Sequence, residues 1–404
     1  MSVTLEQRAG VPGTQPAQPG IRSILIVSAA WLVLMAGVNL PTPLYAVYSQ
    51  RFGFSSAVLT LIFAVYAFVL VPALMLFGQL SDRLGRRPVM LLGLGAAATG
   101  LVVFAFAQST VWLYAGRALQ GLAVGMASSA ATAALVELEP RADARRPALL
   151  AGLAQAGGSG AGPLVAGVLA QWAPAPERLC YLVLLVATAA AAVLVARIAE
   201  PAKGARRAWR ITRPHVPDEI RGKFARLGLT AAALWATVAL YLSIVPSYAA
   251  TLLHTSNLAL LAAISALALG TSCVAQIVAR RAASGRRAQE LGLVLLAAGL
   301  AALVVASPLG SLAVLVAGAV LAGAGHGIGF LHAQDELNRI APPERRGEVT
   351  AAFITCIYAG VAGSVITIGV LDLRVALATA VAVVAVVLAA AALAAAAWHR
   401  RAEI

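Results

Sequence analysis

The chain has 404 residues, of which 61% are hydrophobic and only 11% are charged. About a quarter of the residues of a soluble domain are charged, so this composition indicates a polytopic membrane protein and excludes an ordinary soluble one. The net charge of +14 does not indicate nucleic-acid binding, because the basic residues lie in short segments between apolar runs and form no patch interleaved with aromatic residues.

Residues 1–22 are polar and rich in Pro and Gly, and we expect a disordered cytoplasmic tail there, with no cleavable secretory signal. A membrane-spanning helix needs about 20 mostly apolar residues. Twelve runs satisfy this condition: 23–47, 56–80, 88–108, 112–136, 148–172, 179–199, 227–250, 258–280, 290–307, 310–334, 348–370 and 373–398. The sequence therefore predicts an all-α integral membrane protein with twelve transmembrane helices.

Basic residues alternate between the loops. One set of loops contains most of them: Arg83, Arg86, Arg87, Arg141, Arg145, Arg146, Arg280, Arg281, Arg286, Arg287, Arg339, Arg345 and Arg346. The opposite loops contain only Arg51, Arg178 and Arg374. Since basic loops stay in the cytoplasm, both termini are expected there, which an even number of spans permits. The bias toward Ala and Arg is typical of a GC-rich bacterial genome, so the expected location is a bacterial inner membrane.

The chain divides at its middle. Residues 200–226 are the longest hydrophilic connection and are expected to form a cytoplasmic central loop between two six-helix halves, 23–199 and 227–398, followed by a short cytoplasmic tail at 399–404. The halves resemble each other, because a glycine-rich run followed by Pro and Arg occurs near 116–146 and again near 318–346. Two related halves with a site between them at mid-membrane are a known plan for transporters.

A short charged segment, 78–88, lies between the second and third apolar runs. A glycine at position 85 permits a tight reversal with positive φ, and Asp82 near a membrane surface requires a cation or a helix N-terminus. The segment resembles the signature Gly-x-x-x-Asp-Arg-x-Gly-Arg-Arg of the major facilitator superfamily. The matching residues are Gly78, Asp82, Arg83, Gly85, Arg86 and Arg87.

The resemblance covers the chain after residue 22 and implies the twelve-helix fold of that family, which works mostly as a monomer. It also implies a latch that ties the halves together when the cytoplasmic side is closed, with Arg86 reaching Glu137 at the end of the fourth span. The alternative is that these arginines only fix the orientation in the membrane.

Arg117 is predicted to be the only basic residue well inside an apolar run. A charge there costs about 2.5–3.5 kcal/mol, which makes it a candidate for a functional site. With Gln120 it matches a fourth-helix pattern that is tied to proton coupling in the family. The first, second and fourth spans have no Asp or Glu near their middle, so three roles stay open: proton coupling, binding of an anionic substrate, and fixation of backbone carbonyls.

The fifth span contains small residues at close spacing around a proline, which favours close helix packing. Its glycine and proline positions, which resemble the antiporter signature of the family, are Gly158, Gly162, Pro163 and Gly167. That resemblance favours export, and the alternative is ordinary packing in an Ala-rich chain.

His326 lies among four glycines in the tenth span and is a candidate for the proton-bearing residue, because histidine titrates near physiological pH. The alternative is a hydrogen-bonded structural histidine. His332 and the Asp335-Glu336 pair at the end of the same span are expected to be gate or surface residues.

In the family the first, fourth, seventh and tenth helices line the substrate cavity. Proline at 41 and 43 is expected to bend the first of them. The polar and aromatic candidates on these helices are Asn39, Thr42, Tyr45, Arg117, Gln120, Tyr241, Tyr248 and His326. Few charges and several aromatic rings suit a lipophilic or amphiphilic compound better than a free sugar.

The predicted function is therefore secondary transport by alternating access, with proton-coupled export of small lipophilic compounds as the first hypothesis and import of a sugar or organic acid as the second. The expected partners are the lipid bilayer, a small-molecule substrate and coupling protons. Neither a nucleotide-binding loop nor a nucleophile–base pair is recognisable, and Cys180, Cys273 and Cys356 are scattered, so we expect no enzyme, catalytic residue, cofactor or metal.

Overall fold

A computed structural model describes residues 21–77, 80–139, 145–200, 214–282, 286–342 and 345–401. Within these ranges every regular element is a helix. The elements are α1 (Ile21–Asn39), η1 (Thr42–Leu44), α2 (Tyr45–Phe52), α3 (Ser56–Phe77), α4 (Leu80–Leu84), α5 (Arg86–Ala105), α6 (Thr110–Glu137), α7 (Arg145–Trp172), α8 (Leu179–Arg197), η2 (Asp218–Ile220), α9 (Arg221–Ser243), α10 (Val245–Leu253), α11 (Leu258–Ala282), α12 (Arg286–Leu309), α13 (Leu312–Ile340), α14 (Arg346–Leu371) and α15 (Leu377–Arg401).

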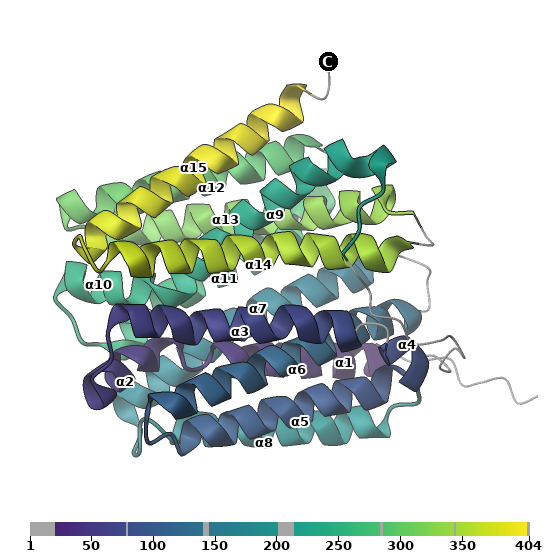
Figure 1. Cartoon of the computed structure of the whole chain (residues 1–404), viewed down its shortest axis with the longest axis horizontal. Coiled ribbons are helices and arrows are strands. Elements are labelled where there is room, and N and C mark those ends of the chain that lie inside the picture. Colours follow the sequence, from purple (N-terminus) through teal and green to yellow (C-terminus); the bar gives the residue numbers. More distant parts are fainter. Residues whose placement is uncertain are drawn as a thin grey trace, which may run out of the picture.

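The helices form two bundles, α1–α8 and α9–α15, that lie side by side (Figure 1). Each bundle has an apolar core of its own, built around residues such as Leu94 and Leu135 in the first and Leu234 and Leu296 in the second. Two pairs of helices join the bundles, because α3 packs against α14 and α7 packs against α11. The two bundles therefore meet where the second predicted span packs against the eleventh and the fifth against the eighth.

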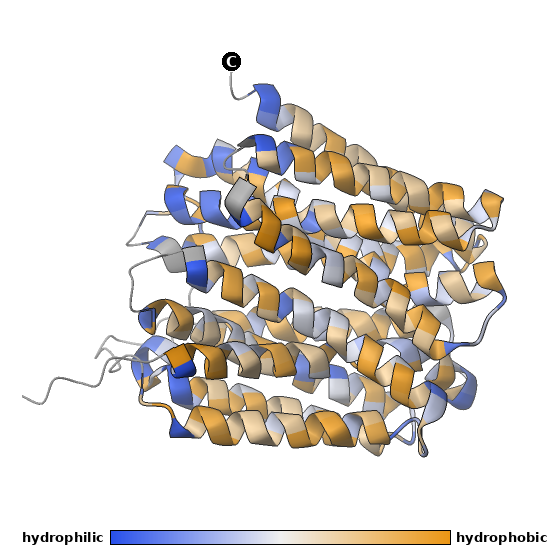
Figure 2. Ribbon diagram, turned by 180° about the vertical axis from the view of Figure 1, so that it is seen from behind, coloured by the Kyte–Doolittle hydropathy of each residue, from blue (hydrophilic) through white to orange (hydrophobic). Residues whose placement is uncertain are grey.

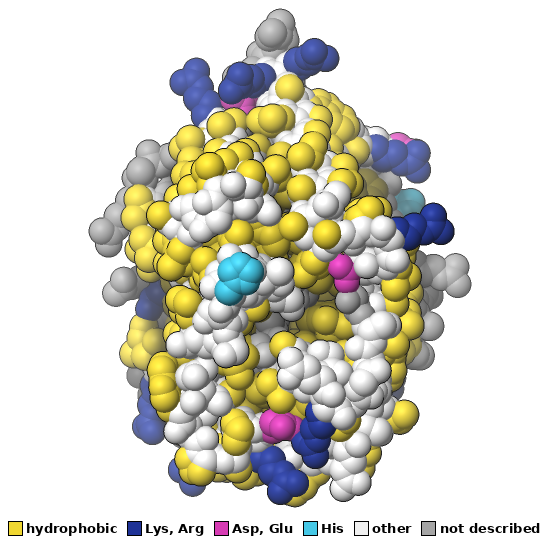
Figure 3. Space-filling view, turned by 90° about the vertical axis from the view of Figure 1, so that its left-hand side faces the viewer, with side chains coloured by type: hydrophobic (Ala, Val, Ile, Leu, Met, Phe, Trp, Pro, Cys, Tyr) yellow, Lys and Arg dark blue, Asp and Glu magenta, His cyan; other side chains and the backbone are white. Residues whose placement is uncertain are grey.

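The surface pattern is that of a membrane protein. Apolar residues cover the length of the helices, whereas hydrophilic residues gather at the helix ends (Figure 2). The start of α1 and the end of α15 lie toward the same end of the molecule (Figure 1). At the opposite end, where α2 and α10 lie, charged side chains are few (Figure 3). The predicted alternation of basic and non-basic loops corresponds to these two ends.

In the described part of the chain, eleven helical segments are long and apolar enough to cross a membrane. Eleven of the twelve predicted spans correspond to them, and most boundaries agree within a few residues. The fifth predicted span does not reach this apolarity. It forms α7, which has 28 residues but includes six glycines and two glutamines that lower its hydropathy. α7 nevertheless lies within the bundle, packed against α1 and α11.

The first helix of each half is broken at a matching place. α1 ends at Asn39, and a short 3₁₀ turn connects it to α2; α9 ends at Ser243, and α10 follows two residues later. Each short second helix then ends in a left-handed residue, Gly53 with φ 66° and His254 with φ 47°. The correspondence supports the internal repeat inferred from the sequence.

Glycine positions repeat between the halves as well. Gly121 and Gly125 let α6 approach α3, and their counterparts Gly323 and Gly327 let α13 approach α11. A Cβ at Gly323 would overlap the carbonyl oxygen of Ala268 on α11. Since only glycine permits this contact between backbones, both halves have kept the same close packing of their second and fourth spans.

Candidate transport site

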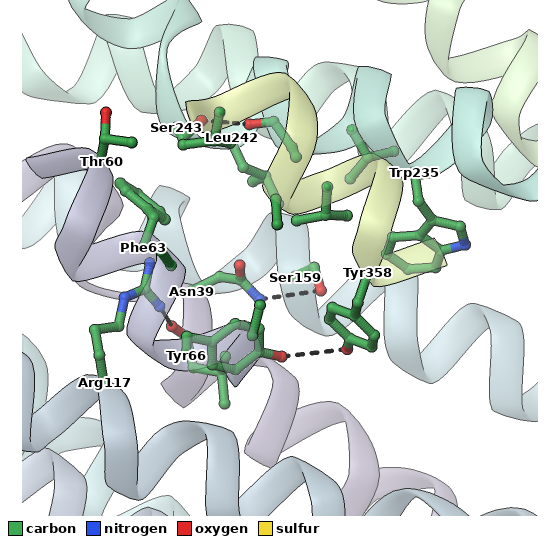
Figure 4. Close-up of a pocket in the computed structure, with 18 of the residues that line it drawn as sticks. Asn39, Thr60, Phe63, Tyr66, Arg117, Ser159, Trp235, Leu242, Ser243 and Tyr358 are labelled. Atoms are coloured by element: carbon green, nitrogen blue, oxygen red, sulfur yellow. Dashed lines mark hydrogen bonds between the residues drawn. The ribbon is translucent and has the colours of Figure 1, made fainter. Parts of the chain in front are cut away.

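A cavity lies between the two halves, bordered by α1, α3, α6, α7, α9 and α14 (Figure 4). It encloses about 780 Å³ of space not filled by atoms, part of it open to solvent. None of its lining residues comes from α13, which corrects the expectation that the tenth span lines it, and the second, fifth and eleventh spans contribute instead.

The wall is largely apolar and aromatic. Phe63, Tyr66, Trp235 and Tyr358 supply its rings. The hydroxyl groups of Tyr66 on α3 and Tyr358 on α14 lie 3.4 Å apart, so a hydrogen bond crosses from one half to the other (Figure 4). No Asp, Glu or His is among the described residues that line the cavity.

Asn39, at the last position of α1, is a polar member of the wall. Its Nδ2 donates to the carbonyl oxygen of Met35 at 3.0 Å and to Ser159 Oγ on α7 at 3.1 Å (Figure 4). The side chain therefore connects the broken end of the first helix to the fifth span.

Arg117 on α6 provides the charge of the cavity wall. It is only 2% exposed, and its Nη1 donates to the carbonyl oxygen of Val38 at 3.0 Å and to Gln120 Oε1 at 3.1 Å. The guanidinium carbon lies 4.5 Å from the ring centroid of Phe63, 5.4 Å from that of Tyr45 and 5.5 Å from that of Tyr66. A buried cation is thus surrounded by aromatic rings and backbone carbonyls.

The break in the first helix explains why those carbonyls accept these bonds. Pro41 has no N–H, so the carbonyl of Gly37, four residues earlier, cannot form its usual helical hydrogen bond. Gln120 Nε2 donates to that oxygen at 3.0 Å, next to the bond from Arg117 to Val38. The fourth span therefore supplies side-chain donors to backbone groups that the proline-containing bend leaves without a helical partner.

The positive charge of Arg117 is only partly compensated by its neighbours in the described part of the protein. A charge inside a membrane span costs about 2.5–3.5 kcal/mol, and a cation–π contact returns about 0.5–2 kcal/mol. The three rings can offset much of this cost, but Arg117 Nε is buried without a hydrogen-bond partner among the described residues. The cavity wall therefore includes a positive charge that no lining carboxylate neutralises.

His326 on α13 lies behind the cavity wall. It is 1% exposed; its Nδ1 is 2.9 Å from Ser272 Oγ, whereas its Nε2 has no partner in the described structure. The imidazole contacts the Trp235 ring edge to face, with the ring centroids 5.2 Å apart. It stacks on the Phe330 ring, with the ring centroids 5.6 Å apart. Trp235 lines the cavity, so one aromatic ring separates His326 from it.

The other predicted pathway residues lie outside the lining. Thr42 is buried in η1, and the ring of Tyr45 contacts Arg117, with the guanidinium carbon 5.4 Å from the ring centroid. Tyr241 and Tyr248 lie in the apolar core of the second half, where the Tyr248 hydroxyl donates to the carbonyl of Leu303 at 3.2 Å. Of the eight residues predicted for the pathway, Asn39 and Arg117 line the cavity directly.

The predicted latch residues meet at the end of α4 and the start of α5. Arg86 donates to Glu137 through Nη2 at 2.7 Å and through Nε at 3.1 Å; it also donates to Ser81 Oγ at 2.8 Å and forms an ion pair with Asp82. These contacts lie within the first half. Gly78 lies outside the described residues, and Arg83 is exposed.

Gly85 has a second role that the sequence alone did not reveal. Its φ of 101° favours glycine, and a Cβ would come 2.7 Å from the carboxyl carbon of Glu200. That carboxylate accepts hydrogen bonds from the backbone N–H groups of Arg86 at 2.6 Å and Arg87 at 3.2 Å. A carboxylate at a helix N-terminus is stabilised by the helix dipole, so Glu200 anchors the segment after α8 to the start of α5.

The glycines of α7 bring that helix against both halves. A Cβ at Gly158 or Gly162 would overlap carbonyl oxygens of α1, those of Leu32 and Ala36. A Cβ at Gly167 would overlap Ala262 on α11. Pro163 lies inside α7, directly after Gly162. The small residues thus place the fifth span between the two bundles.

A buried ionic cluster in the second half was not predicted. Arg226 Nη2 on α9 donates to Glu336 Oε1 on α13 at 2.8 Å, and Gln289 Nε2 on α12 donates to Glu336 Oε2 at 2.7 Å. Arg226 is 3% exposed and Glu336 8%. The expectation that Arg226 belongs to the central loop is wrong, because α9 begins six residues earlier than the predicted span, and Glu336 and His332 are buried rather than at the surface.

Comparison with known proteins agrees with this architecture. The sequence model described as Major Facilitator Superfamily matches residues 27–365. The class D tetracycline resistance protein of Salmonella ordonez is 35% identical over 116 residues, which cover 28% of this chain and 29% of that protein. The bacillibactin exporter of Bacillus subtilis (strain 168) is 28% identical over 159 residues, which cover 38% of this chain and 40% of the exporter. The aligned stretches thus span less than half of these relatives.

Two solved structures share the fold over nearly the whole chain. The human organic anion transporter MFSD10 (TETRAN) superposes with a TM-score of 0.72 at 19% identity, covering 95% of this chain and all of that one. A bacterial homologue of the human lysosomal transporter Spinster, in an inward-facing and unoccupied conformation, superposes with a TM-score of 0.71 at 15% identity. The superposition covers 97% of this chain and 98% of that one.

Proposed function

This chain belongs to the Major Facilitator Superfamily and is a secondary membrane transporter rather than an enzyme, and we propose that it exports small, largely apolar compounds in exchange for protons. The cavity between the two halves is the main observation in favour of this function. Transporters built from two repeats bind their substrate at that interface and expose it to each side of the membrane in turn.

The composition of the wall supports a lipophilic substrate. Four aromatic rings and several aliphatic side chains line the cavity, whereas free sugars require many hydrogen-bonding groups. An importer of a sugar is therefore the weaker alternative, and an organic acid stays compatible with Arg117.

Export is favoured over import by two observations. Proteins that match parts of this chain are named as tetracycline resistance proteins and as a bacillibactin exporter. The fifth span contains Gly162-Pro163 in a run of small residues between the two halves, at the place where the antiporter signature of the family is expected.

Protons are the proposed coupling ion, with His326 as the residue that binds them. It is the histidine next to the cavity wall in the described structure, separated from the cavity by Trp235. One charge that crosses 100 mV releases about 2.3 kcal/mol, which suffices for modest accumulation. We further propose a bacterial inner membrane location with both termini in the cytoplasm and a monomeric protein.

The test is dissipation of a pH gradient in inverted membrane vesicles by a panel of lipophilic cations, neutral antibiotics and organic anions. We expect at least one compound to collapse the gradient with the intact protein and not with Arg117→Ala. Arg178→Ala is the matched control, because it removes an arginine from an outer loop. Accumulation of a panel compound that requires the protein but no gradient would contradict proton-coupled export.

A further inference from the structure

We propose that the cavity selects amphiphilic organic anions, whose carboxylate or similar acidic group pairs with Arg117 while an apolar body contacts the opposite wall. The proposal rests on the proposed function, because it takes the cavity as the transport site. It goes further by assigning the charge of the substrate.

The first argument is the charge balance of the cavity. Arg117 is 2% exposed and lines the cavity, and no Asp or Glu is among its described lining residues. On the six helices around the cavity, the acidic residues Glu137 and Glu348 occur only in terminal turns. An anion that enters the cavity would thus meet an uncompensated positive charge in a surrounding of low polarity, where such attraction is strong.

The second argument is the hydrogen bonding of the guanidinium group. Its Nη1 is engaged by Val38 and Gln120, which fix the group in place. Its Nε is buried and lacks a partner among the described residues. A buried donor without a partner is unfavourable, and a carboxylate is the acceptor whose geometry best matches a guanidinium.

The third argument concerns cations. Aromatic rings in a cavity often bind cationic ligands through their faces. Here the rings of Tyr45, Phe63 and Tyr66 already contact Arg117, between 4.5 and 5.5 Å from its guanidinium carbon. A cationic substrate would find these rings occupied and would be repelled by the same charge.

The shape of the site explains why the anion should be amphiphilic. In Figure 4, Arg117 lies at the left of the pocket, Trp235 lies at the right and Leu242 lies at the top. A molecule that pairs its acidic group with Arg117 therefore extends its remaining atoms toward aromatic and aliphatic side chains of the second half.

Three probes of one shape test the proposal: 2-naphthoate, 2-naphthamide and 2-naphthylmethylammonium. Their binding to the full-length protein in detergent is measured by isothermal titration calorimetry. We expect the carboxylate to bind at least tenfold more tightly than the amide, and the ammonium to bind least. Arg117→Gln should remove the preference for the carboxylate over the amide, and Arg117→Lys should retain part of it. Arg178→Gln, which removes an outer arginine, should leave the preference unchanged.

Equal binding of the three probes, tighter binding of the ammonium, or no carboxylate binding at millimolar concentration would each overturn the proposal. The comparison among probes uses the unaltered protein, so it stands even where Arg117→Gln fails to fold. Because binding is measured without a gradient, an absence of proton coupling would refute the proposed export mechanism and leave the anion preference intact.

Discussion

Gln120 donates a hydrogen bond of 3.0 Å to the carbonyl oxygen of Gly37, the group that Pro41 deprives of its helical partner. The neighbouring Arg117 bonds the next carbonyl, that of Val38, at 3.0 Å. The two side chains therefore stabilise the bend of the first span from the fourth span. They also keep the guanidinium at the cavity wall, so the bend and the charge of the site depend on each other.

Gln120→Leu should lower the stability of the folded protein without removing a charge. The Gly37 carbonyl would remain buried and unbonded, which costs about 1–3 kcal/mol. Thermal unfolding of the purified protein in detergent measures the effect. Gln171→Leu is the matched control, because it removes a solvent-exposed hydrogen bond that the Gln171 side chain accepts from the backbone N–H of Leu258. Equal unfolding midpoints for the two variants would argue against a structural role for Gln120.

Gly162→Ala should disrupt the packing of α7 against α1. The new Cβ would overlap the carbonyl oxygen of Ala36, and overpacking of this kind costs about 1–3 kcal/mol or more. Gly270→Ala is the control, because no atom outside its own helix lies within 4 Å of the added methyl group. Fluorescence-detected size-exclusion chromatography after heating should separate the two variants, and similar survival would contradict the close contact.

Arg226→Met and Glu336→Met should each destabilise the second half strongly. Removing one member of a buried ion pair costs about 3–5 kcal/mol, because the other charge is left without its partner. The double variant Arg226→Met/Glu336→Met should recover much of the loss, as a double-mutant cycle of unfolding midpoints would reveal. Arg221→Gln, which affects an exposed pair with Asp218, should cost no more than about 1 kcal/mol. Additive losses in the double variant would mean that the pair is not coupled.

Asp82→Asn should reduce transport at least tenfold and leave membrane insertion normal. The variant weakens the ion pair with Arg86 and thereby the contact of Arg86 with Glu137, while no span changes. Transport in inverted vesicles is compared at equal protein level with Asp218→Asn, which alters an exposed ion pair after the central loop. Full activity of Asp82→Asn would remove the latch from the mechanism.

His326→Asn should abolish gradient-driven export while exchange of labelled for unlabelled substrate persists. Asparagine can keep the hydrogen bond to Ser272, but it cannot bind and release a proton at neutral pH. His254→Asn, at the left-handed end of α10, is the control. Unchanged gradient-driven export in His326→Asn would exclude this histidine as the coupling residue.

The sequence predicted the architecture well because long apolar runs have few alternatives in a membrane. The motifs of the family resemblance include Arg86 and Arg117, and the resemblance implied Glu137 as the partner of Arg86. Contacts between distant segments were not predictable in the same way. The hydrogen bond between Glu200 and the start of α5 joins residues more than 110 positions apart, and no sequence pattern at either residue predicts this contact.

The boundary of the seventh span shows a different reason for failure. Arg226 looked like part of a charged loop, because several basic residues precede it. The helix begins at Arg221, directly after the 3₁₀ helix η2, which contains Asp218 and Glu219. Acidic residues at this place favour a helix start. The absence of α13 from the cavity lining has a packing cause, since Gly323 and Gly327 draw that helix against α11 and Trp235 covers His326.

The unneutralised charge of Arg117 also determines where the membrane voltage can act. An empty cavity holds one positive charge, whereas a cavity with a monovalent anion is neutral. A charge that moves through a cytoplasm-negative potential gains about 2.3 kcal/mol per 100 mV. With the orientation and the proton exchange proposed above, the voltage would assist the return of the substrate-free, protonated transporter to its cytoplasm-open state and act little on the substrate-loaded step. The return step, rather than substrate crossing, would then be the electrically driven half of the cycle.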